Sequence, residues 1–293
     1  MKNVLVLFQG DIFIFLKKID MKLSLFSFLG FPENSIEKFI DAGAPVIKDY
    51  EDYCRTLTQM PGEKNLTEKG ERSFSFCRNP GADTQITFDD IDKNYLENAR
   101  ILHVGSLSLT QEPAKTTTLQ IISSVKKAGG IISYDPNWRE SLWAGKENAL
   151  DELKSILPMA DIVKVSDEEL KLLFGNVSYK EGAEIICNTG AKLVSITLGS
   201  KGVYYRYSNN GDVFEGTVEC PEVKVVDTTG AGDSFNGGLL YRLTRKEDIL
   251  NLTKEELEED LKFANAVASL CVTRHGGLPA LPVYEEVEKL LKL

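Results

Sequence analysis

A glycine-rich segment between two apolar runs carries the residue types needed to hold a phosphate group. It reads VVDTTGAGDSFNGGLLYRL over residues 225–243, so a strand is expected to end at Asp227 and a helix to begin near Ala231. The backbone amides of Gly230, Ala231 and Gly232 would then lie at a helix amino terminus, where N–H donors and the helix dipole favour an anion. Small residues also let a phosphate approach the backbone closely. The segment therefore predicts an anion hole for phosphoryl transfer.

An acidic residue in the first turn of that helix has the chemistry of a catalytic base. Asp233 directly follows the small residues, so its carboxylate could take a proton from a substrate hydroxyl held in line with a transferred phosphate. The segment contains neither the GxxxxGK[ST] of a Walker loop nor a GxGxxG dinucleotide fingerprint. A glycine-rich strand-to-helix turn with no catalytic role is the structural alternative, but the length of the DTTGAGDSFNGG run favours a site.

The elements that must position this segment are expected to be strands alternating with helices. From about residue 100, apolar strand-like runs occupy 101–105, 131–135, 161–165 and 192–197, and helix-length segments occupy 113–128, 147–157 and 180–189. This alternation predicts right-handed βαβ units, a parallel sheet with helices on both faces, and ligands beyond the carboxyl ends of the strands. Residues 202–226 are expected to form a β-meander that turns at Asn210-Gly211.

Length and composition indicate one globular α/β domain over residues 1–293, with 42% hydrophobic and 27% charged residues. The formal net charge of -10 argues against nucleic acid as a partner. Charged residues interrupt the apolar amino terminus, so no membrane span is expected. The five cysteines form no CxxC pair, which favours reduced thiols and a cytoplasmic location: Cys54, Cys77, Cys187, Cys220 and Cys271.

Further motifs follow in a fixed order along the chain. They are GERSFSFCRNPGAD (70–83), HVGSLSL (103–109), SYDPNWRESLW (133–143), ADIVKVSDEEL (160–170), TLGSKGV (197–203) and FANAVASLCVTRHGGLPALP (263–282). Together with DTTGAGDSFNGG, they give residues 67–293 a specific resemblance to the ribokinase-like, or PfkB-type, carbohydrate kinases, closest to the fructokinases. The resemblance implies a three-layer α/β/α fold with a mainly parallel central sheet and a small β lid. It also implies ATP-dependent transfer of the γ-phosphate to a hexose hydroxyl, with fructose the leading substrate.

The resemblance also implies roles for individual residues. Asp233 would be the base, and Gly230, Ala231 and Gly232 the anion hole. Nucleotide-side positions would be Thr197, Gly199, Gly202, Asn265, Glu169 and Lys164. Glu169 would also hold Mg²⁺ through water, with Ser166 at the position where many relatives have Asn. A monovalent cation, K⁺, would lie at Asp227 and the backbone around Cys271, Arg274 and Gly276. Sugar-side positions would be Arg78, Asn79, Asp135, Asn137 and Arg139.

Several of these residues have plain structural alternatives. Arg139 could hold a phosphate in a bidentate manner or form a surface ion pair. Asp135 and Asn137 could belong to the site or cap the turn after a strand. Glu169 could have the purely structural role of stabilising the dipole of the helix in whose first turn it lies. His103 is expected to be a buried, hydrogen-bonded histidine without a catalytic role.

The amino-terminal 60 residues depart from the family pattern. Relatives begin with a strand carrying G-[DE]-x-x-x-D, whose last Asp binds sugar hydroxyls. In this chain GDIFIF at 10–15 has Phe15 at the position of that Asp. Relatives then have a GGAPANVA segment, of which this chain retains only the GAP at 43–45. The lid, with strands expected within about 5–25 and 70–88, and the first βαβ unit are therefore predicted to be incomplete. A shortened sheet would expose an edge and favour a homodimer.

The altered amino terminus leaves three functions open. The first is a fructokinase, and the second is another PfkB-type enzyme such as a 2-keto-3-deoxygluconate kinase, which shares most of these motifs. The third is a catalytically impaired nucleotide-binding relative that acts through interactions. Because Asp233 and its neighbours are intact, the sequence favours an enzyme.

Overall fold

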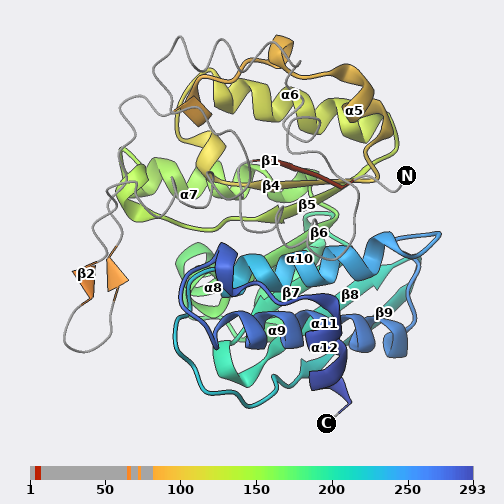
Figure 1. Cartoon of the computed structure of the whole chain (residues 1–293). Helices are drawn as coiled ribbons and strands as arrows, with labels where there is room; N and C mark the ends of the chain where they lie inside the picture. Colours follow the sequence, from red (N-terminus) through yellow and green to blue (C-terminus); the bar gives the residue numbers. More distant parts are fainter. Residues whose placement is uncertain (1–3, 8–64, 67–71, 74–81, 293) are drawn as a thin grey trace.

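The central feature of the computed structural model, which describes residues 4–7, 65–66, 72–73 and 82–292, is a seven-stranded sheet. Its order is β1-β4-β5-β6-β7-β8-β9 (Figure 1). The parallel strands are β1 (Val4–Leu7), β4 (Ile101–Gly105), β5 (Ile131–Asp135), β6 (Ile162–Ser166) and β7 (Leu193–Thr197). β8 (Val203–Asn209) and β9 (Asp212–Val218) continue the sheet in antiparallel pairing. The strands predicted over residues 101–105, 131–135, 161–165 and 192–197 are confirmed to within one residue, as is the turn at Asn210-Gly211. The strand expected to end at Asp227 is wrong: β9 ends at Val218, and residues 219–227 are irregular, with the amides of Val226 and Asp227 donating to the carbonyl of Val272 instead of to a sheet.

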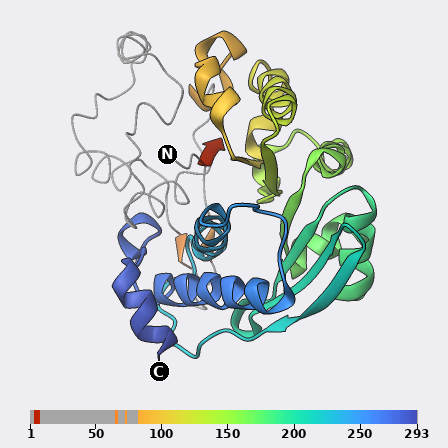
Figure 2. The same cartoon turned by 90° about the vertical axis from the view of Figure 1, so that its right-hand side faces the viewer.

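Helices cover both faces of the sheet. Alternate strand residues point to opposite sides, so each face presents its own apolar side chains to the helices packed on it. One face packs against α10 (Ala231–Thr244), α11 (Lys254–Cys271) and α12 (Tyr284–Leu291), drawn in blue in Figure 2. The other face packs against α5 (Lys93–Asn98), α6 (Ala114–Lys127), α7 (Lys146–Ser155), α8 (Asp167–Phe174) and α9 (Tyr179–Asn188). Two buried apolar layers therefore enclose the sheet, and they form a three-layer α/β/α arrangement.

The sheet face below α10 changes from apolar to polar along the strands. Ile101, Ile162 and Leu193 begin their strands in the apolar core shared with α10 and α11. Two residues further along, the same face carries buried polar side chains: His103, Ser133, Lys164 and Ser195. The strands end on this face with Asp135, Ser166 and Thr197. The polarity is thus concentrated at the carboxyl ends, next to the first turn of α10.

A close approach fixes α10 against α11. A Cβ added at Gly238 would lie 3.0 Å from the Cα of Ala264 and 3.1 Å from a methyl group of Val267. Because there is no room for a side chain at Gly238, the backbones of the two helices can lie directly against each other. This packing holds the amino terminus of α10 over the polar ends of β5 and β6.

A separate antiparallel pair consists of β2 (Asn65–Leu66) and β3 (Arg72–Ser73). β3 falls within one of the ranges expected for the lid. Of the other range, 5–25, only residues 5–7 are described, and they lie in β1 of the central sheet, parallel to β4. The lid and the single-domain organisation stay predictions. Within the described part of the chain, no helix combines the length and apolar character required to cross a bilayer.

Candidate active site

The start of α10 has the backbone geometry expected of an anion hole. Gly230 is the N-cap and adopts the left-handed conformation, with φ 78°, which glycine reaches without steric cost. Ser234 donates its amide to the carbonyl of Gly230 at 2.8 Å and closes the first helical turn. The amide of Ala231 makes a longer contact of 3.3 Å with the carbonyl of Thr228. Among the residues that the structure describes, the amides of Gly230 and Gly232 meet no backbone acceptor.

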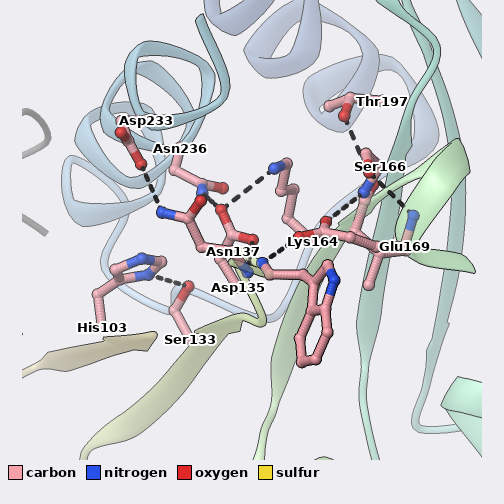
Figure 3. Close-up of polar contacts among 12 residues, drawn as sticks. His103, Ser133, Asp135, Asn137, Lys164, Ser166, Glu169, Thr197, Asp233 and Asn236 are labelled. Atoms are coloured by element: carbon pink, nitrogen blue, oxygen red, sulfur yellow. Dashed lines mark hydrogen bonds and ion pairs between the residues drawn. The ribbon is translucent and has the colours of Figure 1, made fainter. Parts of the chain in front are cut away.

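Asp233 lies in this first turn and points toward the end of β5. Its Oδ1 accepts a hydrogen bond from the side-chain amide of Asn137 at 3.5 Å (Figure 3). The carboxylate is half-buried. It therefore lies next to the helix amino terminus, as predicted, and remains accessible to solvent.

A buried ion pair lies beneath the first turn of α10. Nζ of Lys164, on β6, is 3.1 Å from Oδ2 of Asp135 at the end of β5, and Nδ2 of Asn236 donates to the same oxygen at 2.7 Å. Residue exposures are 7% for Lys164 and 1% for Asp135. A Cβ at Gly232 would lie 3.1 Å from the Lys164 Nζ, so the ammonium lies against the anion hole itself.

Lys164 is held in its charged form. Burial lowers the pKa of its ammonium, but the charges of Asp135 and Glu169 and the hydrogen bond to Asp135 raise it by more, so the pKa lies above its usual value. A charged Lys164 adds positive potential beneath the amides at the start of α10, which favours an anion there.

Glu169 forms the capping box of α8 and also ties that helix to the loop after β5. Its Oε2 accepts from the amide of Ser166 and its Oε1 from the amide of Trp138, both at 2.8 Å, while its own amide donates to the Ser166 hydroxyl at 3.0 Å. The capping alternative is therefore observed. In the described ranges, no group of three His, Cys, Asp or Glu residues could hold a metal. A role for Glu169 toward Mg²⁺ stays a prediction, and water would have to mediate it.

Four of the six predicted nucleotide-side residues lie around the ends of β7 and β9, whereas Lys164 and Glu169 lie on β6 and α8. Thr197 is the last residue of β7, and Gly199 and Gly202 follow it with φ 59° and 90°. A Cβ at Gly202 would lie only 2.0 Å from the carbonyl oxygen of Val218, so the chain's own packing already requires glycine there. Asn265 on α11 donates to the carbonyls of Val218 and Glu219 at 3.0 and 3.1 Å.

Asp227 joins two loops in the region predicted to hold a monovalent cation. The carboxylate is buried, with 1% of the residue exposed. Its Oδ1 accepts from the amide of Thr229 at 2.8 Å and its Oδ2 from the amide of Gly276 at 3.0 Å. Sγ of Cys271 lies 3.7 Å from the carbonyl oxygen of Thr229. The side chain of Arg274, in contrast, forms an ion pair with Glu286 on α12.

The remaining predicted residues are placed less centrally or not at all. Arg78 and Asn79 lie outside the described residues, as does Phe15. Arg139 donates from its guanidinium to the carbonyl of Trp138 at 2.8 Å. Asp135 caps the turn after β5, because its Oδ1 accepts from the amide of Asn137 at 3.0 Å. The turn alternative is thus observed for Asp135, and its role toward a sugar stays a prediction.

Sequence reasoning placed His103 correctly and missed Asn236. His103 is fully buried, and its Nδ1 lies 2.9 Å from the hydroxyl of Ser133 (Figure 3). Burial, with a smaller effect of the Lys164 charge, lowers its pKa to about 3, so the ring is neutral. Asn236 contacts Asp135 from α10. A signal for it existed, since it lies three residues after Asp233 in an otherwise apolar and small-residue helix.

Comparison with known proteins gives this site a family. The fold and the site together define an α/β phosphotransferase. The model of the pfkB family carbohydrate kinases matches residues 52–283. Probable fructokinase-2 of Arabidopsis thaliana is 41% identical over 229 residues, which are 78% of this chain and 68% of the relative. The chain therefore belongs to the pfkB family of carbohydrate kinases. The predicted enzyme class, an ATP-dependent sugar kinase of the fructokinase type, is confirmed.

Solved structures share the architecture. A fructokinase with bound ATP from Xylella fastidiosa has a TM-score of 0.75 and 26% identity, covering 97% of this chain and 89% of its own. A fructokinase from Vibrio cholerae O395 in a form with fructose, ADP and calcium ion has a TM-score of 0.73 and 27% identity, covering 99% and 96%. The predicted ribokinase-like three-layer fold is confirmed. The match to the family model starts at residue 52, so it leaves out most of the 60 residues predicted to depart from the family pattern.

Proposed function

We propose that this protein transfers the γ-phosphate of ATP to a hydroxyl of fructose, with Asp233 as the general base. One observation carries the proposal: the carboxylate of Asp233 lies in the first turn of α10, beside backbone amides that meet no backbone acceptor in the described structure. Two related structures support the assignment of ATP and fructose as substrates, since one solved fructokinase holds ATP and another holds fructose and ADP.

The reaction assigned to this site needs little covalent chemistry from the protein. Asp233 accepts the proton as the sugar oxygen attacks the γ-phosphorus, and the bond to the leaving ADP breaks. The amides of Gly230 and Gly232, with Lys164 beneath them, stabilise the charge on the transferred group. The family resemblance assigns Thr197, Gly199, Gly202 and Asn265 to the nucleotide side and Arg139 to the sugar side, together with Arg78 and Asn79, which lie outside the described residues.

Two inorganic cofactors fit the residues present to different degrees. A monovalent cation, K⁺, is assigned to the two loops joined by the buried Asp227: each carboxylate oxygen accepts a backbone N–H, so Asp227 supplies negative charge, and backbone carbonyls such as that of Thr229 supply the oxygen ligands. Mg²⁺ neutralises phosphate charge in such enzymes. It would be held by the nucleotide and by water, because the backbone already occupies both oxygens of Glu169.

The substrate assignment is tested with a panel of sugars. Purified protein with ATP, Mg²⁺ and K⁺ is assayed for ADP release with fructose, 2-keto-3-deoxygluconate, ribose and glucose. We expect the highest kcat/KM with fructose. A preference for 2-keto-3-deoxygluconate would reassign the substrate within the family. Absence of turnover with every sugar, alongside measurable ATP binding, would overturn the kinase proposal and favour a nucleotide-binding protein that acts through interactions.

Replacing Asp227 by Asn tests the cation proposal. The new amide group must present an N–H to a neighbouring backbone N–H, either that of Thr229 or that of Gly276, so one of the two hydrogen bonds is lost. A buried bond to a charged group contributes about 1.5–3 kcal/mol. We expect Asp227→Asn to lower the free energy of unfolding by about that amount and to abolish any activation of turnover by K⁺ over Na⁺. Equal K⁺ activation in the variant and the wild type would contradict the assignment.

The proposal also covers the cellular location and the oligomeric state of the protein. The three described cysteines, Cys187, Cys220 and Cys271, are free thiols, which supports a reducing compartment such as the cytoplasm. The homodimer stays a prediction, to be checked by the mass of the protein in solution.

A further inference from the structure

Asn137 has an unusual backbone conformation in the described structure. It and Asn210 are the non-glycine residues with positive φ there, at 45° and 52°. Asn210 lies in the two-residue turn between β8 and β9, where such a conformation is expected. Asn137 lies in the loop after β5 and has no hairpin to explain it. A strained conformation of this kind persists only where the surroundings hold it, and it is often found at active sites.

Three separate elements hold the loop around Asn137. Its own amide donates to Asp135 Oδ1 at 3.0 Å. The carbonyl of the preceding Pro136 accepts from Ser106, after β4, at 3.3 Å, and the amide of the following Trp138 donates to Glu169, on α8, at 2.8 Å. The conformation at Asn137 is therefore determined by contacts from β4, β5 and α8.

Asp135 connects this loop to two further elements. Its Oδ2 is held by the ammonium of Lys164 on β6 and by the amide of Asn236 on α10. Its Oδ1 accepts the backbone amide of Asn137. Both oxygens of Asp135 are thus engaged by the protein, and the side chain fixes the loop rather than presenting a carboxylate to a sugar.

The result is that the Asn137 side chain points at the base. Its Nδ2 lies 3.5 Å from Asp233 Oδ1, and Figure 3 shows the two side chains directed toward one another. A bond to a carboxylate is typically 2.7–2.9 Å when fully formed. Catalytic hydrogen bonds are often long before substrate is bound, and they tighten in the reacting complex.

We propose that Asn137 is a positioning residue for the general base: its amide holds Asp233 Oδ1 and so orients the carboxylate at the start of α10. The proposal rests on the assignment of Asp233 as base, and it gives Asn137 and Asp135 a different role from the sugar binding implied by the family resemblance. Among the described residues, the charge of Lys164 on β6 interacts with that of Asp233, and the same ammonium faces Asp135 on β5 and Glu169 on α8; His103 on β4, which also faces Lys164, is neutral.

The pH dependence of kcat/KM separates positioning from substrate binding. Asn137→Gly keeps a residue that tolerates positive φ and removes the amide. We expect kcat at the pH plateau to fall about 10- to 100-fold and the acidic limb of the profile to move up by about one pH unit. Asn137→Asp puts a second carboxylate beside Asp233, so the acidic limb of the kcat/KM profile of this variant should move to a still higher pH. The control is Asn210→Gly, which changes the other positive-φ Asn and should leave kcat and the limb unchanged.

A readout independent of turnover keeps the inference separate from the proposed function. The carboxyl carbon of Asp233 is titrated by NMR in protein labelled with ¹³C-aspartate and is assigned by its absence in Asp233→Asn. We expect a higher Asp233 pKa in Asn137→Gly than in the wild type, even if no sugar is turned over. An unchanged pKa with an unchanged acidic limb would overturn the inference. So would a variant that only raises KM for the sugar, because that result would make Asn137 a substrate ligand. Thermal unfolding and ATP affinity establish that each variant is folded; if Asn137→Gly is not, Asn137→Asp is titrated in its place.

Discussion

Asp233→Asn is expected to reduce kcat by about 10²- to 10⁴-fold, the usual contribution of a positioned base. Asn has the same shape and can still contact the amide of Asn137, but it cannot accept the proton of the sugar hydroxyl. The amides of Gly230 and Gly232 are unchanged by the substitution. ATP affinity should therefore be retained or slightly improved, since one negative charge near the phosphates is removed.

The experiment compares steady-state turnover with ATP affinity measured by calorimetry. A matched control is Asp212→Asn, the same change at an exposed position at the start of β9, which is the edge strand of the sheet, whereas Asp233 lies by the end of the central strand β5. The control should keep wild-type kcat. If Asp233→Asn turned over fructose at a near-normal rate, Asp233 would not be the base. If it lost ATP affinity along with turnover, the carboxylate would instead be needed to build the nucleotide site.

The fold was largely predictable from local patterns. Short runs rich in apolar and β-branched residues, such as 101–105 and 131–135, became β4 and β5, as expected of parallel strands that are buried on both faces. The Asn210-Gly211 pair gave the hairpin, since few residue pairs accept positive φ twice. The start of α10 at Ala231 was predictable too, and Gly230 just before it adopts a left-handed conformation that suits glycine; its role in an anion hole stays a prediction.

The sequence could not decide whether the carboxylates of Asp135 and Glu169 bind a ligand or hold the protein's own backbone. Asp135 and Glu169 each had a local capping alternative, and the structure shows those capping contacts. It also shows long-range contacts that no local pattern contains, from Asp135 to Lys164 and from Glu169 to the amide of Trp138. Such pairs depend on which strands become neighbours in the sheet. Gly202 was assigned to the nucleotide side from the family resemblance, which stays a prediction; the described structure gives packing against Val218 as a sufficient reason for glycine at this position.

The stability of the protein should fall steeply as the pH is lowered from 7 to 5, and His103 should cause part of that fall. In the folded state, burial holds its pKa at about 3, whereas in the unfolded chain it returns to about 6.5. Between these values the unfolded state binds a proton that the native state does not, so the free energy of unfolding decreases as the pH falls. The contribution is complete above pH 6.5, and about 2 kcal/mol of it is lost between pH 7 and pH 5.

The chain provides its own control for this prediction, because His103 and His275 are its two histidines, and His275 is exposed. Unfolding by urea is measured at several pH values between 5 and 7 for the wild type, His103→Asn and His275→Asn. His103→Asn can retain a hydrogen bond to Ser133; it should be less stable at pH 7 but show a slope smaller by up to about 1.4 kcal/mol per pH unit. His275→Asn should keep the wild-type slope. Because a domain of this kind has only about 5–15 kcal/mol of stability, the difference is large enough to measure. Parallel slopes for the wild type and His103→Asn would mean that the histidine is protonated, or reached by water, in the folded protein.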